Sequence, residues 1–562
     1  MEYHEDIDQE KGMNEPLLNH PSKSLGGVGT LPFILANEGF EKAAYYGLLP
    51  NMILYLMGVY GLDIATGSNI IFLWCAATNF TPIVGAFLAD AYVGRFQMIG
   101  FGCVSALMGM MLLWSTTIIP GVTPPSHEET SSNSNSATLI QLVYICTGLG
   151  LMSIGSGGIR SSSMAFGTDQ LLSNSKPNGK QSLETFVSWY YFCSILAMVF
   201  ALTCIVYIQD HFGWQIGFAI PVSLMFVSAL CFFSASSFYV KMKPMSSVFT
   251  GLSQVVVASW RNRHYQFSSY PGADTIYHVA KGSILQVPTQ KLRFLNKACI
   301  VKDRQRDISI DGIANDPWSL CTIDQVEDFK AIVNIIPIWS TGIMLAVTHS
   351  CVSSFLVVQA KSMDRHFITP SFEIPCASFG TFALSSVLLW IVLYDRVFIP
   401  LASRVMGKTV AIHVITRMGI GFVLSFACMV VAGVVENARR SIAIKGKLVM
   451  PMSALWLVPQ VCLIGLAEGI TSIAQIEFFY SKFPKSMASI SVNLAALAIS
   501  VSSLVASIIV SVINYVTKQD GAESWISNDP NKGHYDYFYC VLAGLSLLNF
   551  IYFLVCSRSY RE

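Results

Sequence analysis

Three charged residues stand close together in the apolar stretch from Asn37 to Gly47, and their spacing gives them one helical face. Glu38 and Glu41 are i, i+3, and Glu38 and Lys42 are i, i+4. Two carboxylates beside one ammonium leave one carboxylate able to take up a proton. The spacing predicts a proton-binding site. A purely structural cluster of ion pairs that joins helices is the alternative.

Arg160 lies in a run of glycine and serine, Gly155 to Ser163, which would let another backbone approach closely. Arginine keeps its charge in proteins, so it needs a carboxylate or an anionic substrate as a partner. Glu38 and Glu41 are the obvious candidates. The alternative is an arginine at a helix end, facing the membrane interface.

The second half of the chain holds two more ionisable residues in apolar surroundings, His349 and Glu468. The chemistry of His349 alone favours a hydrogen-bonded packing residue, although a histidine can carry a proton near neutral pH. Glu468 is the only acid deep in the C-terminal half, which favours a functional role over a hydrogen-bonded carboxylic acid in the core.

Asp90 and Arg95 flank a short connection that contains Gly94. They can pair across the turn, and such a pair can break and form again when two helices move. The alternative is a static cap. We predict that this pair acts as a gate.

The composition indicates what must hold these residues in place. Of 562 residues, 53% belong to the hydrophobic set and only 12% are charged, about half of the roughly 25% usual in soluble domains. This excludes a disordered chain and argues against a soluble enzyme. The net charge of +1 offers no field to attract nucleic acid. The sequence shows no zinc-type Cys/His spacing, nucleophile elbow or phosphate loop, so we expect neither enzyme activity nor a metal or cofactor.

A membrane-spanning helix needs about 20 mostly apolar residues. Twelve segments qualify, which predicts an all-α membrane protein: 31–58, 68–91, 98–120, 138–165, 186–209, 214–238, 328–352, 372–395, 412–435, 452–480, 487–516 and 535–557. The predicted organisation is an N-terminal tail, a six-helix bundle, a polar central loop, a second six-helix bundle and a C-terminal tail, over residues 1–30, 31–238, 239–327, 328–557 and 558–562.

The distribution of Lys and Arg predicts that both tails and the central loop are cytosolic. One outer loop contradicts this rule, because it holds Arg439, Arg440, Lys445 and Lys447. Within the central loop, apolar residues recur at helical spacing from Ser246 to Tyr265. This segment is predicted to be an amphipathic helix, either on the inner leaflet or packed on its own loop.

Several motifs carry a family resemblance: NEGFEKAAYYGLLPNMILYL at 37–56, GAFLADAYVGRF at 85–96, GSGGIRSSSMAFGTDQL at 155–171 and PQVCLIGLAEGITSIAQIEFFY at 459–480. With them, the chain resembles the plant nitrate transporter / peptide transporter family. This is the plant branch of the proton-coupled oligopeptide transporters in the major facilitator superfamily. The resemblance implies two six-helix bundles around a central cavity that opens alternately to either side.

The resemblance also implies roles for individual residues. Glu38, Glu41 and Lys42 would couple proton movement to transport, with Lys42 where the family usually has arginine. Arg160 matches a basic residue that pairs with this acidic motif, and Glu468 matches an acid of the tenth helix.

His349 falls where the dual-affinity plant nitrate transporter contacts nitrate. The candidate substrate-binding residues are therefore His349, Arg160, Glu468, Tyr45 and Tyr46. Met98 stands where that transporter carries a phosphorylated threonine, so we expect no such affinity switch. The stretch Trp189 to Ser194 lacks an asparagine usual in the family, which speaks against peptide transport.

The predicted function is proton-coupled symport of nitrate, for low-affinity uptake or redistribution, across a plant membrane. The plasma membrane is favoured over the vacuolar membrane. The expected partners are a small anionic substrate, protons and the lipid bilayer. The alternatives are organic anions such as gibberellin, abscisic acid or glucosinolates, or di- and tripeptides. A nitrate sensor or a channel is a more distant alternative.

Overall fold

The computed structural model of the protein describes most of the chain, and every structural statement below concerns this part: residues 26–124, 137–172, 179–242, 248–264, 277–280, 287–309, 312–367, 369–407, 412–445, 452–483, 488–519 and 523–560.

The first half of the chain is helical. After a 3-10 turn at Val28–Thr30, its helices are α1 (Leu31–Leu48), α2 (Met52–Gly58), α3 (Ile64–Leu88), α4 (Arg95–Ser115), α5 (Leu139–Leu172), α6 (Gly179–Phe200) and α7 (Val206–Ser234). A π-helical turn, Ala201–Ile205, joins α6 to α7. The chain reverses direction within α7, at Gly213, whose φ of 80° lies in the left-handed region that glycine adopts without strain.

The second half is also helical, apart from one small hairpin. Its long helices are α10 (Ile323–Lys361), α11 (Gly380–Leu393), α12 (Ile399–Met406), α13 (Val414–Lys445), α14 (Val458–Lys482), α15 (Ala488–Thr517) and α16 (Tyr535–Arg558). Strands β1 (His366–Phe367) and β2 (Thr369–Glu373) pair antiparallel between α10 and α11, with His366 opposite Glu373. Short 3-10 helices cover Cys376–Phe379 and Ala454–Leu457.

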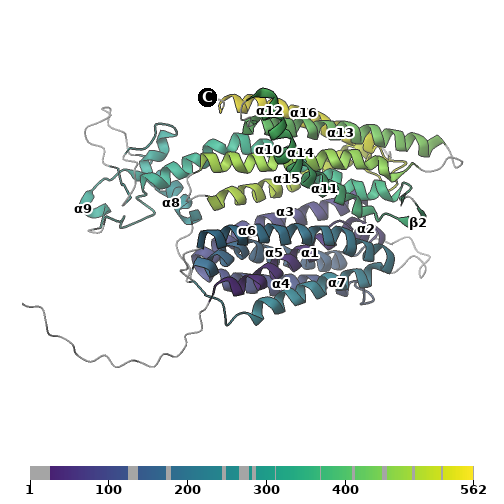
Figure 1. The fold of residues 1–562 in the computed structure, drawn as a ribbon, viewed down its shortest axis with the longest axis horizontal. Coiled ribbons are helices and arrows are strands. Elements are labelled where there is room, and N and C mark those ends of the chain that lie inside the picture. The colour runs from purple at the N-terminus through teal and green to yellow at the C-terminus, as the bar shows by residue number, and fades with distance from the viewer. Residues whose placement is uncertain are drawn as a thin grey trace, which may run out of the picture.

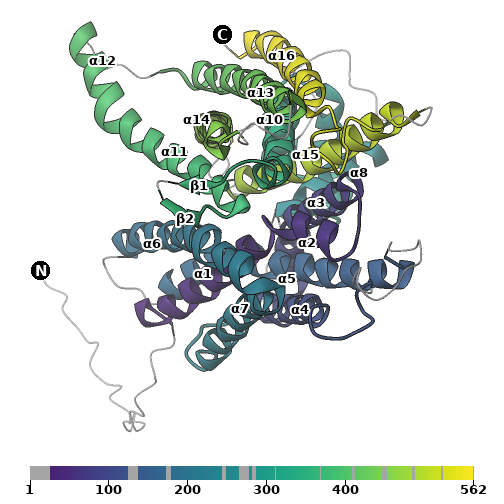
Figure 2. The same ribbon diagram turned by 90° about the vertical axis from the view of Figure 1, so that its right-hand side faces the viewer.

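The helices form two bundles. In Figure 1, α1–α7 in purple and blue lie below α10–α16 in green and yellow. Figure 2, turned by 90°, shows the same two groups of helices one below the other. We call the end with α8 (Val248–Arg261) and α9 (Arg304–Asp307) the tail end and the end with β1 and β2 the hairpin end, left and right in Figure 1.

Ten helical stretches in the described ranges are long and apolar enough to cross a membrane. One of them, Leu183–Ser234, contains the segment predicted at 186–209 and most of the one predicted at 214–238, and α1 with its three charges is not counted. Each of the twelve predicted segments therefore corresponds to helix. The predicted fold class, an all-α membrane protein of the major facilitator type with two six-helix bundles, is confirmed.

Close contact between α4 and α5 positions the helix that carries Arg160. A Cβ atom on Gly155 would lie 2.4 Å from the backbone nitrogen of Ala106, and one on Gly109 would lie 2.6 Å from the carbonyl oxygen of Gly148. The two backbones approach this closely because these positions carry no side chain.

The predicted amphipathic segment in the central loop is helix α8, although residues 246–247 and 265 lie outside the described ranges. Its residues Val255 and Ala258 are buried in a small core with Cys299 and Ile323. One side of α8 is thus packed on the central loop and the start of α10. Val256 and Trp260 on the same helix stay exposed.

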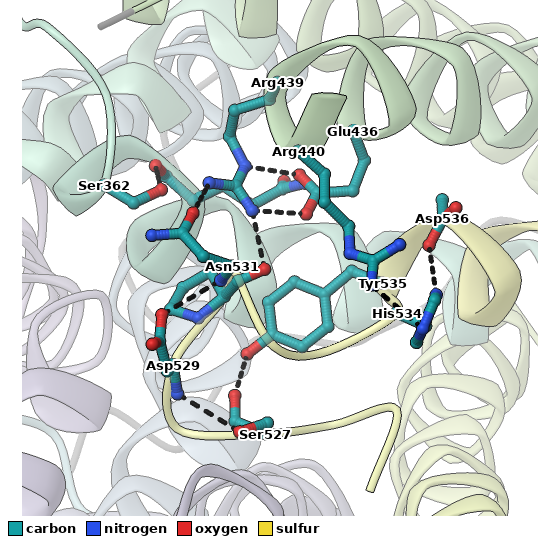
Figure 3. A network of polar contacts seen from close by, with 12 residues as sticks. Ser362, Glu436, Arg439, Arg440, Ser527, Asp529, Asn531, His534, Tyr535 and Asp536 are labelled. Carbon is teal, nitrogen blue, oxygen red and sulfur yellow. Dashed lines mark hydrogen bonds and ion pairs between the residues drawn. The ribbon is translucent and has the colours of Figure 1, made fainter. Parts of the chain in front are cut away.

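One of the four charges that contradict the charge rule, Arg439, lies inside a helix bundle. The predicted segment 412–435 is too short, because α13 continues to Lys445 and includes Arg439 and Arg440. Arg439 is only 3% exposed and forms an ion pair of 2.8 Å with the fully buried Glu436 (Figure 3). Its charge is neutralised inside the bundle, so it does not belong in a tally of loop charges. Lys447 lies outside the described residues.

Candidate functional site

The acidic motif of α1 forms two separate ion pairs. Lys42 Nζ lies 3.2 Å from Glu38 Oε1, one turn away on the same helix. Glu41 pairs with Arg160 of α5, with 3.1 Å from Nη2 to Oε1 and 3.3 Å from Nε to Oε2. Both glutamates are buried. Of the two carboxylates considered as partners of Arg160, the structure therefore places Glu41 against it.

Two serines that the sequence analysis did not single out complete these pairs. Ser156 lies one turn before Arg160 and donates a hydrogen bond of 2.6 Å to Glu41 Oε1. Lys42 donates one of 2.9 Å to Ser194 Oγ. Ser156 belongs to the motif 155–171 that carries the family resemblance, whereas Ser194 ends the stretch 189–194 that departs from the family pattern.

Glu41 and Glu38 differ in how many hydrogen bonds their carboxylate oxygens accept. Glu41 receives hydrogen bonds from Ser156 and Arg160. The buried Oε2 of Glu38 makes no hydrogen bond to any described residue, although the Tyr190 side chain interacts with this carboxylate. Glu41 is therefore the more completely hydrogen-bonded of the two carboxylates.

Tyr45 and Tyr46 lie beside Arg160 rather than apart from it. The guanidinium carbon is 4.5 Å from the centre of the Tyr45 ring and 6.0 Å from that of Tyr46. Tyr45 is buried and also packs against Trp74. Both rings can stabilise the cation of Arg160. A role of either tyrosine in binding substrate stays a prediction.

The C-terminal bundle brings together two residues that were predicted separately. His349 Nδ1 of α10 lies 2.5 Å from Glu468 Oε2 of α14. Their side chains are 35% and 42% exposed, so the pair is partly open to solvent. The pair is ionic when His349 carries a proton.

The predicted gate pair is part of a larger cluster at the tail end. Asp90 lies in the π-helical turn Ala89–Val93 and pairs with Arg95 at 3.1 Å. Arg95 Nη1 also donates to both carboxylate oxygens of Asp169, at 2.8 Å each. Asp169, which lies in the quoted motif 155–171, was missed. It ties the start of α4 to α5.

Hydrogen bonds between the two bundles gather toward the hairpin end. Asn69 of α3 donates to Ser511 at 2.9 Å, and Ser500 of α15 donates to the carbonyl of Ala76 at 2.9 Å. Near the hairpin, Arg365 pairs with Asp210 at 3.3 Å. These contacts hold the bundles together from the middle of α3 to the hairpin end.

A helical fold of two bundles that crosses the membrane many times, with ion pairs buried between its helices, defines a membrane transporter of the major facilitator type. Comparisons with known proteins agree. Residues 96–526 match the model of the POT family. The chain is 47% identical to protein NRT1/PTR family 1.2 of Arabidopsis thaliana, over 96% of this chain and 91% of that protein. It is 48% identical to protein NRT1/PTR family 1.1 of the same plant, over 98% and 93%.

Among solved structures, the fold resembles the POT family transporter PepTSo, with a TM-score of 0.69, 19% identity and coverage of 95% and 98% of the two chains. The chain belongs to the POT family and, within it, to the NRT1/PTR proteins. It is therefore a proton-coupled transporter, not an enzyme.

Proposed function

We propose that this transporter carries nitrate together with protons across the plasma membrane of a plant cell. The observation that supports this most directly is the partly exposed His349–Glu468 pair between α10 and α14. Nitrate is a small, weakly basic anion, and a cavity that holds it must supply a cation or hydrogen-bond donors. A protonated His349 supplies both.

The pairing with Glu468 makes nitrate binding depend on protons. While Glu468 is ionised, it pairs with protonated His349, which is the cation that nitrate needs. A proton on Glu468 removes this competitor and leaves protonated His349 for the anion. Charge would then be balanced inside the cavity, where an isolated ion is costly.

The acidic motif of α1 would supply the second proton-dependent step. With both carboxylates ionised, Lys42 and Arg160 are held by Glu38 and Glu41. A proton on this pair of carboxylates frees a cation on the wall of the N-terminal bundle. We propose that this change favours closure of the outer side, and that the Asp90–Arg95–Asp169 cluster opens and closes the tail end.

The tail end would face the cytosol, as the distribution of Lys and Arg predicts, and the hairpin end the outside. The coupling ion would be the proton alone. Low-affinity uptake or redistribution of nitrate would be the physiological role.

An organic anion is the second candidate, because aromatic rings lie beside the two cations Arg160 and Lys42 of the N-terminal bundle. Tyr45 and Tyr46 lie against Arg160, and the centre of the Tyr190 ring lies 5.5 Å from Lys42 Nζ. A carboxylate on a bulky apolar body, as in gibberellin or abscisic acid, would suit such a wall.

Uptake into oocytes that express the full chain separates these candidates. Labelled nitrate, a dipeptide, gibberellin and abscisic acid are offered in turn at pH 5.5 and pH 7.4. We expect nitrate uptake that is larger at pH 5.5. Uptake of a hormone or the dipeptide without nitrate uptake would refute nitrate as the substrate, and equal uptake at both pH values would refute coupling to protons.

A further inference from the structure

A compact group of five charged or titratable residues lies at the hairpin end, outside the sites described above. Arg365 follows the end of α10, Asp364 and His366 flank it, Glu373 ends β2, and Asp210 belongs to the N-terminal bundle. Only the contact between Arg365 and Asp210 in this group crosses from one bundle to the other.

Arg365 contacts residues of both bundles. Its Nη2 lies 2.7 Å from Glu373 Oε2, and its Nη1 donates to the carbonyl of Ile374 at 3.2 Å and to Asp210 Oδ2 at 3.3 Å. If the bundles separate here, Arg365 keeps Glu373 and Ile374, and Asp210 is left to water. The contact can therefore break without leaving a buried charge unpaired.

His366 joins the two carboxylates that flank this arginine. Its Nδ1 lies 2.6 Å from Asp364 Oδ1 and its Nε2 lies 3.2 Å from Glu373 Oε1. A neutral imidazole has one N–H and can donate to only one of them, whereas the protonated ring donates to both. Hydrogen bonds from His366 also hold the pKa of Asp364 below its usual value.

We propose that Arg365 and Asp210 form the latch that keeps the hairpin end closed, and that protonation of His366 strengthens it. When His366 is charged, it shares the negative charge of Glu373, and Arg365 is more available to Asp210. When His366 is neutral, Glu373 competes more strongly for Arg365. Lys361, exposed at the end of α10, is a further charged residue close to this region.

A native cysteine lies behind the latch and can report its opening. Cys376 is 4% exposed, and its short helix Cys376–Phe379 contacts α7 and the turn Ala201–Ile205 of the other bundle. Ser378 of the same helix donates to the carbonyl of Leu202 at 2.9 Å. Separation of the bundles at this edge would expose the thiol.

The test measures the rate at which a maleimide alkylates Cys376 in the full chain in nanodiscs, followed by mass spectrometry of the peptide that contains it. Rates are divided by those of the unfolded chain at the same pH, which removes the pH dependence of the thiol itself. For Asp210→Asn we expect a rise of about twofold to fivefold, the range of a partly exposed ion pair.

Two control variants keep the test specific. Asp210→Glu retains the charge and should stay near the wild-type rate. Glu523→Gln makes the same carboxylate-to-amide change in an ion pair within one bundle, with Lys532 at 3.3 Å, and should leave the rate unchanged. An unchanged rate in Asp210→Asn, or an equal rise in Glu523→Gln, would overturn the latch.

The pH dependence is tested separately at pH 5.5 and pH 7.5. The wild-type rate should be lower at pH 5.5, and His366→Gln should abolish the difference. The same pH dependence in both proteins would overturn the role of His366. The proposal rests on alternating access in this family and not on the substrate. Labelling needs no substrate, so its failure would leave the proposed nitrate transport untouched.

Discussion

The buried network around Arg439 allows the sharpest prediction about stability. Arg439 donates to both oxygens of Glu436 at 2.8 and 2.9 Å, to Asn531 Oδ1 at 2.8 Å and to the carbonyl of Pro530 at 2.7 Å (Figure 3). In Arg439→Gln the fully buried Glu436 would keep only the hydrogen bond of 2.8 Å from Gln359.

The expected cost follows from this geometry. Removal of one partner of a buried ion pair destabilises a protein by about 3–5 kcal/mol, because the remaining charge is uncompensated. Since Gln359 still donates to Glu436, we expect the lower end of this range, about 3 kcal/mol. The double variant Arg439→Gln with Glu436→Gln carries no buried charge and should recover more than half of the loss.

The assay is equilibrium unfolding of the purified full chain in mixed micelles at neutral pH, with the free energy of unfolding compared between variants. Lys532→Gln is the matched control, because it removes a cation from the exposed pair with Glu523 and should cost less than about 1 kcal/mol. If Arg439→Gln costs no more than this control, the reasoning about the buried charge is wrong.

Three further predictions concern the N-terminal bundle. Glu41→Gln should abolish the stimulation of uptake at pH 5.5 relative to pH 7.4, because Arg160 loses the carboxylate that couples it to protons; undiminished stimulation would contradict the coupling. Asp169→Asn should slow transport about fivefold at equal surface expression, since Arg95 loses the charge of its ion pair with Asp169, worth roughly 1 kcal/mol; an unchanged rate would exclude a gating role. Gly155→Val should greatly reduce the yield of folded protein in fluorescence-detected size exclusion, because its Cβ would overlap the backbone of Ala106, and a normal yield would show that α4 and α5 can separate there.

The sequence predicted the helices well, because apolar length is a property of each segment alone. It also predicted that Arg160 would meet the acidic motif, since few other charges lie within the spans. It could not predict that His349 pairs with Glu468, because 118 residues separate them and only the packing of α10 on α14 brings them together.

The errors have equally physical causes. Hydropathy places Arg439 in a loop, because an apolar segment is taken to end at its first charged residues. The ion pair with Glu436 becomes evident only when the structure shows that both side chains are buried. Asp169 was passed over because a lone acid near a helix end is usually solvated. Its contact with Arg95 depends on how α4 and α5 come together at the tail end.

The claim that nitrate and protons move together is tested most directly in liposomes that contain the purified chain and an internal pH indicator. An inward nitrate gradient is applied with equal pH on both sides and the membrane potential clamped to zero. We predict that nitrate entry acidifies the interior, and that His349→Ala abolishes both nitrate entry and acidification. Nitrate entry without acidification would contradict symport and indicate a channel.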